Sequence, residues 1–104
     1  MANPMAGEVD VVLNGEVLTA RLTLGALAEL EQDLKAESLL VLVERFEQGR
    51  FSARDVLAVL AAGLRGGGWR GRVDDLLAAD IGGGPLAAAR LAAALLAHAF
   101  RLPE

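Results

Sequence analysis

The dipeptide Asn14-Gly15 is the feature that most constrains how this 104-residue chain can fold. It separates two short segments, residues 8–13 and 16–22, in which apolar and polar residues largely alternate. Asn-Gly favours a two-residue β-turn because both residues adopt positive φ at low cost. The sequence therefore predicts an antiparallel hairpin over residues 8–22 in which Leu13 pairs with Glu16. In this register one face of the hairpin carries Val9, Val11, Leu13, Leu18 and Ala20.

Four to five helices are predicted after the hairpin, mainly from the spacing of their apolar residues. Thr23, Ser38 and Ser52 are suited to cap the first three, because a hydroxyl oxygen accepts a hydrogen bond from an unpaired first-turn amide. Ser52, with an aspartate three residues later, resembles a capping box. Glycine triplets at 66–68 and 82–84 interrupt the helical pattern. The predicted helices span about residues 24–36, 39–48, 53–65, 73–79 and 85–100.

These elements define an α+β fold, with an N-terminal β-hairpin followed by a bundle of four to five short helices. Residues 8–104 are expected to form a single domain, as is usual for a chain of this length. Residues 1–7 are small and polar, lack the basic segment of a secretion signal, and are expected to be a flexible tail. A hydrophobic content of 54% excludes a disordered acidic chain.

The composition excludes several classes of function. The chain has no cysteine, which rules out disulfides, thiolate catalysis and cysteine-based zinc sites. A net charge of -4 and an aromatic content of 4% argue against binding to nucleic acid or to an anionic membrane. No apolar run reaches the ~20 residues of a membrane span. We therefore expect a cytoplasmic protein.

The residues that catalysis requires are scarce. His98 is the only histidine, and a lone histidine on an apolar helix is more often structural than catalytic. Ser38 and Ser52 occupy positions typical of helix caps. Residues 66–71 match G-x-G-x-x-G, but they follow a predicted helix, whereas a dinucleotide site needs this turn between a strand and a helix. We expect no enzymatic activity, no cofactor and no metal.

A glycine-rich loop contains the most promising candidates for partner binding. Arg65, Arg70 and Arg72 surround Trp69, and Trp and Arg are frequent at the energetic centres of protein interfaces. The alternative is a solvated loop with Trp69 folded onto the core.

Two further features point to a partner. Leu40 and Val41 lie off the main apolar face of their predicted helix, so we expect them to be buried against a partner or a second copy of the chain. The edges of the hairpin carry little charge protection and could accept a strand from another protein. Both features favour a protein that works by contact with other polypeptides.

Three segments carry a resemblance to a known family: LTLGALAELE at 22–31, GRFSARDVLAVL at 49–60 and GLRGG at 63–67. In this order they resemble the gene transfer agent family of phage-tail proteins, which are described as tail-assembly chaperones or tail-tube-associated proteins. The resemblance covers about residues 8–100.

The resemblance implies a non-enzymatic, prophage-derived protein with no catalytic, cofactor-binding or metal residues. It would hold the tail tape-measure protein, recruit tail-tube subunits, or both, in the cytoplasm or transiently in assembling particles, and a homo-oligomer is possible. The alternative is a permanent minor component of the tail. A DNA mimic is disfavoured, because Arg45, Arg50 and Arg54 interrupt the acidic surface.

Overall fold

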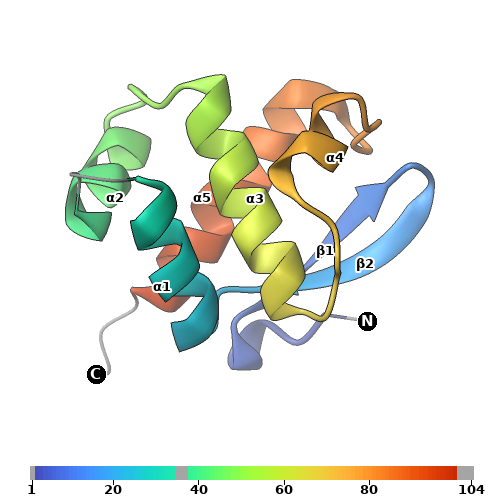
Figure 1. Cartoon of the computed structure of the whole chain (residues 1–104), viewed down its shortest axis with the longest axis horizontal. Coiled ribbons are helices and arrows are strands. Elements are labelled where there is room, and N and C mark those ends of the chain that lie inside the picture. Colours follow the sequence, from blue (N-terminus) through green and yellow to red (C-terminus); the bar gives the residue numbers. More distant parts are fainter. Residues whose placement is uncertain (1, 35–37, 101–104) are drawn as a thin grey trace.

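The computed structural model describes residues 2–34 and 38–100. It has the predicted α+β architecture, in which an N-terminal hairpin precedes a bundle of helices (Figure 1). The elements in chain order are a 3-10 helix (Pro4–Ala6), β1 (Glu8–Leu13), β2 (Glu16–Arg21), α1 (Leu24–Asp33), α2 (Leu39–Glu47), α3 (Ala53–Gly66), α4 (Val73–Leu77) and α5 (Gly84–Ala99).

The hairpin forms in the predicted register. Asn14 and Gly15 have φ values of 51° and 82°, as a tight turn that matches the right-handed strand twist requires. Leu13 pairs with Glu16, and Glu8 lies opposite Arg21 at the open end. The face that was predicted to be apolar turns toward the helices, so the hairpin contributes directly to the core. Its buried members are Val11, Leu13 and Ala20.

Residues 80–82 cover part of the outer edge of β1. The Asn14 N–H donates to the Asp80 carbonyl at 2.8 Å, and the Asp80 N–H donates to Asn14 Oδ1 at 2.9 Å. The Gly82 N–H donates to the Val12 carbonyl at 2.9 Å, and Ile81 forms a bridge with Leu13. The prediction that this edge is free to accept a foreign strand is wrong at these positions, because another part of the same chain occupies it.

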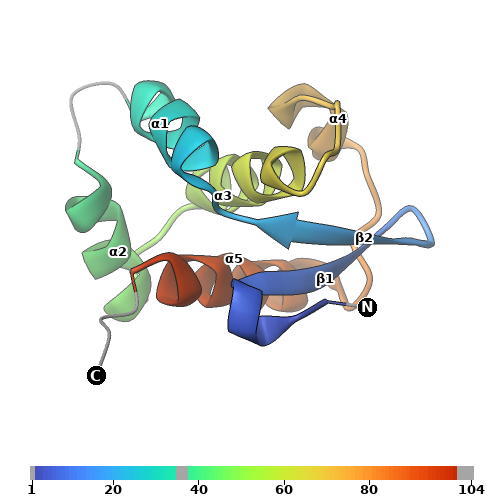
Figure 2. The same ribbon diagram turned by 90° about the horizontal axis from the view of Figure 1, so that it is seen from below.

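Helix α3 is the centre of the bundle and packs against β2, α1, α4 and α5 (Figures 1 and 2). It supplies more buried positions than any other described helix because neighbours surround it on several sides. In the view of Figure 2, β2 lies between α3 and α5; α3 packs against β2 and α5 against β1. The buried residues of α3 are Val56, Val59, Leu60, Ala61, Ala62, Gly63 and Leu64.

Two glycines at the end of α3 lie directly on the backbone of β2. A Cβ atom at Gly66 would collide with the Arg21 carbonyl oxygen, and one at Gly67 would collide with that of Thr19. From the sequence these glycines were expected only to interrupt the helical pattern. Instead the missing side chains let the helix backbone approach the outer edge of the strand, which also covers this second edge of the hairpin.

The predicted helix caps are confirmed. The oxygens of Thr23, Ser38 and Ser52 accept hydrogen bonds of 3.1, 3.3 and 3.1 Å from first-turn amides. The Asp55 carboxylate accepts the Ser52 N–H at 2.9 Å, which completes the predicted capping box. The first helix ends at Asp33, and the predicted extension over residues 35–36 lies outside the described residues. Helix α4 ends two residues earlier than predicted.

The N-terminal segment forms a short turn before β1. The Asn3 side chain accepts the Met5 N–H at 3.1 Å, and the Asn3 carbonyl accepts the N–H groups of Ala6 and Glu8. These bonds stabilise the 3-10 turn because Asn favours turns through its own side chain. The Asn3 N–H also donates to Glu8 Oε1 at 2.9 Å, which ties the turn to the start of β1.

Candidate functional site

The loop after α3 is held by a specific helix-ending motif. Gly68 has a φ of 108°, and its N–H donates to the Arg65 carbonyl at 3.0 Å. The Trp69 N–H donates to the Leu64 carbonyl at 2.9 Å. This pair of bonds is a Schellman motif, which satisfies carbonyls that the end of a helix leaves unpaired. The loop therefore leaves α3 along a fixed path.

Arg65 connects this loop to α1. Its Nε atom donates to Glu29 Oε2 at 2.9 Å, and its Nη1 atom donates to the Gly71 carbonyl at 3.3 Å. Both contacts are within the protein. Arg65 was predicted as a partner-binding residue, and the structure places it as a brace between the loop and a neighbouring helix.

Trp69 is half-buried and packs against the core. Its ring lies over Gly71, where a Cβ atom would collide with the indole. Arg70 and Arg72 are exposed and form no ion pair with a carboxylate of the described chain. The Arg72 N–H donates to Asp75 Oδ2 at 2.7 Å and so caps α4. The predicted cluster is therefore not one surface. Trp69 packs against the core, Arg65 connects the loop to α1, and Arg70 and Arg72 are exposed.

Helix α2 presents an apolar and acidic surface to solvent. Leu40 is 65% exposed and Val41 is 41% exposed, as expected for residues that lie off the buried stripe. Glu44 and Glu47 are also exposed and follow Leu40 at helical spacing. We call these four residues the α2 outer face. The opposite side of the helix buries Leu42.

An ion pair joins α2 to α3, and an aromatic stack joins α2 to the connection that precedes α3. The Arg45 guanidinium donates to both carboxylate oxygens of Asp55, at 3.2 and 3.0 Å. The rings of Phe46 and Phe51 are stacked with their centroids 4.7 Å apart. Because Asp55 also caps α3, one carboxylate fixes both the start of that helix and its position against α2. These contacts place Phe51 at the mouth of a groove.

This groove lies between the N-terminal parts of α3 and α5 and has a volume of about 450 Å³. Its lining is mostly apolar, and several of the lining side chains are small. Sequence reasoning missed the groove. The available signal was the set of small residues on both helices, but the sequence alone does not say that they face each other. We call it the α3–α5 groove; its main lining residues are Phe51, Ala53, Leu57, Pro85, Ala88 and Ala89.

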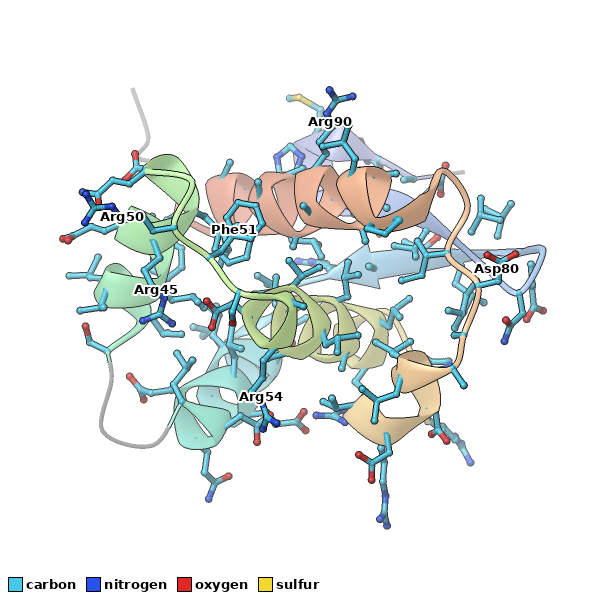
Figure 3. All side chains as sticks on the ribbon, turned by 90° about the horizontal axis from the view of Figure 1, so that it is seen from above. Arg45, Arg50, Phe51, Arg54, Asp80 and Arg90 are labelled. Atoms are coloured by element: carbon cyan, nitrogen blue, oxygen red, sulfur yellow. The ribbon has the colours of Figure 1, made fainter. Side chains whose placement is uncertain are left out.

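Figure 3 shows how Arg50, Arg54 and Asp80 lie relative to the α3–α5 groove. Arg50 extends outward beside α2, and Arg54 extends from the first turn of α3 on the side away from α5. Asp80 lines the groove at the end away from Phe51. Neither Arg50 nor Arg54 forms an ion pair with a described carboxylate.

A second, shallower hollow lies on the other side of α5, where Val12, Leu86 and Arg90 are among its lining residues. His98 lines a third hollow beside Gly7 and Arg21. The described residues contain no group of three or more His, Cys, Asp or Glu side chains placed to hold a metal ion. None of the helices in the described ranges combines the length and apolarity needed to cross a membrane.

Comparison with known protein families decides the broad class of the protein. Residues 6–102 match the model of a family described as "phage tail tube protein, GTA-gp10". The chain belongs to this family. The resemblance to gene transfer agent tail proteins is therefore confirmed. No curated protein matches the chain, and no solved structure matches it.

Membership in the GTA-gp10 family makes this chain a tail-associated protein of a phage-like particle, which points to contacts with other tail proteins. The matched stretch contains every predicted contact residue as well as the α3–α5 groove and the α2 outer face. All the surfaces considered below are thus within the part of the chain that the GTA-gp10 family model covers.

Proposed function

We propose that this protein is a tail-assembly chaperone that binds another tail polypeptide by contact alone, without catalysis, cofactor or metal. The α3–α5 groove is the observation that carries the proposal. A groove of about 450 Å³ has room for several apolar side chains, and an apolar groove between two helices is a common receptor for an amphipathic helix. Its occupant would otherwise expose the same side chains to water.

The tape-measure protein is the proposed primary partner, and tail-tube subunits are the second. A long helical protein exposes an apolar stripe until its tail assembles around it, and such stripes aggregate. Copies of a small protein that each cover one part of the stripe would keep it in solution. We place this activity in the cytoplasm, before and during tail growth.

The modest size of the apolar surface favours reversible binding. The exposed large apolar residues outside the groove are spread over several elements, and among them are Leu24 on α1, Leu77 on α4 and Leu86 on α5. A contact limited to one groove buries less area than a permanent interface usually does. Small interfaces dissociate readily, as a chaperone that leaves the finished tail must do.

A permanent minor component of the tail is the second candidate, because the family description names the tail tube. Quantitative mass spectrometry of purified particles separates the two functions. A chaperone would be depleted from finished particles relative to the tail-tube subunit, although it co-purifies with the tape-measure protein from assembling cells. A constant ratio to the tube subunit in every preparation would establish the permanent component instead.

The groove itself is tested by substitution. Ala89→Trp places an indole in the α3–α5 groove, and we expect it to abolish co-purification of the tape-measure protein. Ala97→Trp is the matched control, because Ala97 is exposed near the other end of the same helix. Equal retention of the tape-measure protein by both variants would contradict the proposed role of the groove.

A further inference from the structure

The hollow between β1 and α5 adjoins apolar surface that no other described part of the chain covers. Val12 on β1 lies opposite Val17 on β2, and because strand side chains alternate, both face away from the core. Val17 is 62% exposed, and Leu86 in the first turn of α5 is 63% exposed. Val12 and Leu86 line the same hollow, which has a volume of about 530 Å³. We call it the β1–α5 hollow.

Two glycines contribute to the shape of the β1–α5 hollow. Gly82 and Gly83 line it just before α5 begins and add no side chain to it. A Cβ atom at Gly82 would lie only 2.8 Å from that of Val12, so the connection runs directly over the strand. Leu86 follows on the next turn of the chain and projects beside this space. One surface therefore carries both a projecting apolar side chain and a hollow with room for one.

Opposite charges lie on the two walls of the β1–α5 hollow. Asp10 belongs to β1 and Arg90 to α5, and both are exposed. Within the described ranges neither forms an ion pair, either with the other or with a third residue. One carboxylate oxygen of Asp10 accepts the Ala2 N–H at 3.1 Å, and the other accepts no hydrogen bond from a described residue. Figure 3 shows Arg90 on the side of α5 away from α3, where another molecule can reach it.

We propose that two copies of this chain form a closed dimer by placing their β1–α5 hollows face to face across a two-fold axis. Leu86 of each copy would enter the hollow of the other. Asp10 of each copy would pair with Arg90 of the other. A two-fold axis brings each wall of the hollow opposite the other wall, so a surface with both charges, and with both a projection and a hollow, is complementary to itself.

This self-complementarity favours a second copy over a different partner. A partner surface of uniform charge would leave either Asp10 or Arg90 facing a like charge, whereas a second copy matches both. The contact is isologous, so it occupies the same surface on both copies and assembly stops at two. Few large apolar residues take part, so the interface is small and the association is weak. We expect a dissociation constant in the range of ~10 μM to ~1 mM.

This inference goes beyond the proposed chaperone function and uses a different surface. The β1–α5 hollow and the α3–α5 groove share no lining residue. A dimer therefore offers two free grooves to one long partner, which strengthens binding without any new kind of contact. Ala89→Trp, which blocks the groove, should dimerise as the wild type does. Loss of partner binding with intact dimerisation would count against the chaperone alone, and a monomeric wild-type chain would count against the dimer alone.

Charge reversal tests the pairing of Asp10 with Arg90. Sedimentation velocity of the wild-type chain should show an average mass that rises from one copy toward two between ~10 μM and ~1 mM and never exceeds two. Asp10→Lys and Arg90→Glu each place like charges opposite one another at two sites, so each should weaken dimerisation at least ~10-fold. The double variant restores opposite charges and should dimerise again. Glu31→Lys and Arg54→Glu are matched controls that should behave as wild type, because both residues are exposed and neither lines the hollow.

A pair of leucines provides a second test that does not depend on charge. Leu86→Gln should weaken dimerisation at least ~10-fold, because each dimer loses two buried leucine side chains. Leu77→Gln on α4 is the matched control: Leu77 is 65% exposed but lies outside the hollow, so this variant should dimerise as the wild type does. Since both leucines are exposed, circular dichroism should show the wild-type fold for both variants, and a change in mass then reports on association.

Three results would overturn the proposal. The first is a wild-type chain that remains monomeric up to ~1 mM, or whose average mass exceeds two copies. The second is dimerisation that neither charge reversal weakens, or a double variant that dimerises no better than the single variants. The third is a Leu77→Gln variant that dimerises as weakly as Leu86→Gln.

Discussion

The two ends of α3 use small residues in opposite ways. At its C-terminal end, Gly66 and Gly67 let the helix backbone lie directly against carbonyl groups of β2. At its N-terminal end, Ala53 lines an open groove together with Ala88 and Ala89 of α5. A small side chain therefore gives a close contact only where another segment packs directly against it. Where no segment packs there, the small side chain leaves a hollow that another molecule can fill.

The largest effect is expected where the backbones meet. Gly66→Ala should lower the free energy of unfolding by about 3 kcal/mol, because its Cβ atom collides with the Arg21 carbonyl and the helix must shift. Gly25→Ala in α1 is the control: a Cβ atom there would lie 3.8 Å from Thr23 Oγ1, an ordinary contact, and the change should be neutral or stabilise by up to about 1 kcal/mol. Urea denaturation measures both. Similar values for the two variants would refute the close approach.

One helical turn of α5 separates a closed site from the open groove. Ala92→Leu should cost about 2.5 kcal/mol because Ala92 is fully buried and extra volume forces its neighbours apart. Ala89→Leu should change stability by less than about 0.5 kcal/mol, because the added side chain enters the α3–α5 groove. Denaturant titration of the pair tests whether the groove is open in solution. Equal destabilisation would show that it is closed.

The groove end of α3 depends on side-chain hydrogen bonds. Asp55→Ala removes both the cap on the Ser52 N–H and the bidentate contact with Arg45. We expect a loss of about 1.5 kcal/mol from the cap and the charge-assisted bonds together. Asp75→Ala, which removes the equivalent cap from the short helix α4, should cost less than about 1 kcal/mol. Thermal denaturation compares the two, and the reverse order would contradict this account.

The smallest effect is expected at Arg65, which connects the glycine-rich loop to α1. Arg65→Gln should cost about 0.5 kcal/mol, because the Arg65–Glu29 pair is partly exposed and is screened by water. The loss should shrink at high salt, which distinguishes an electrostatic contact from a packing contact. A cost several times larger, or one that salt does not alter, would mean that Arg65 packs as part of the core.

The parts of the fold that depend on residues close together along the chain were predictable from the sequence. Asn14-Gly15 specified the turn, and its length set the register that places Val11 in the core. The caps at Thr23, Ser38 and Ser52 followed from local chemistry in the same way. In each case the residues that make the hydrogen bond lie within a few positions of one another.

Contacts between distant residues were not predictable. Glu29 lies 36 positions from Arg65, and Asn14 lies 66 positions from Asp80. No periodicity in the chain identifies such partners. The α3–α5 groove was missed for the same reason, because its existence depends on how far apart two helices settle. Leu40 and Val41 were found because a surplus of apolar residues on one short helix is visible locally.

The link between Asn14 and Asp80 has a consequence for biosynthesis. The hairpin leaves the ribosome well before residues 80–82, which supply the hydrogen bonds to Asn14 at the turn and to Val12 on the outer edge of β1. Until then a nascent chain presents an unfinished strand, which is the kind of surface that pairs with other nascent chains. Translation through residue 82 must therefore precede the final closure of the hairpin.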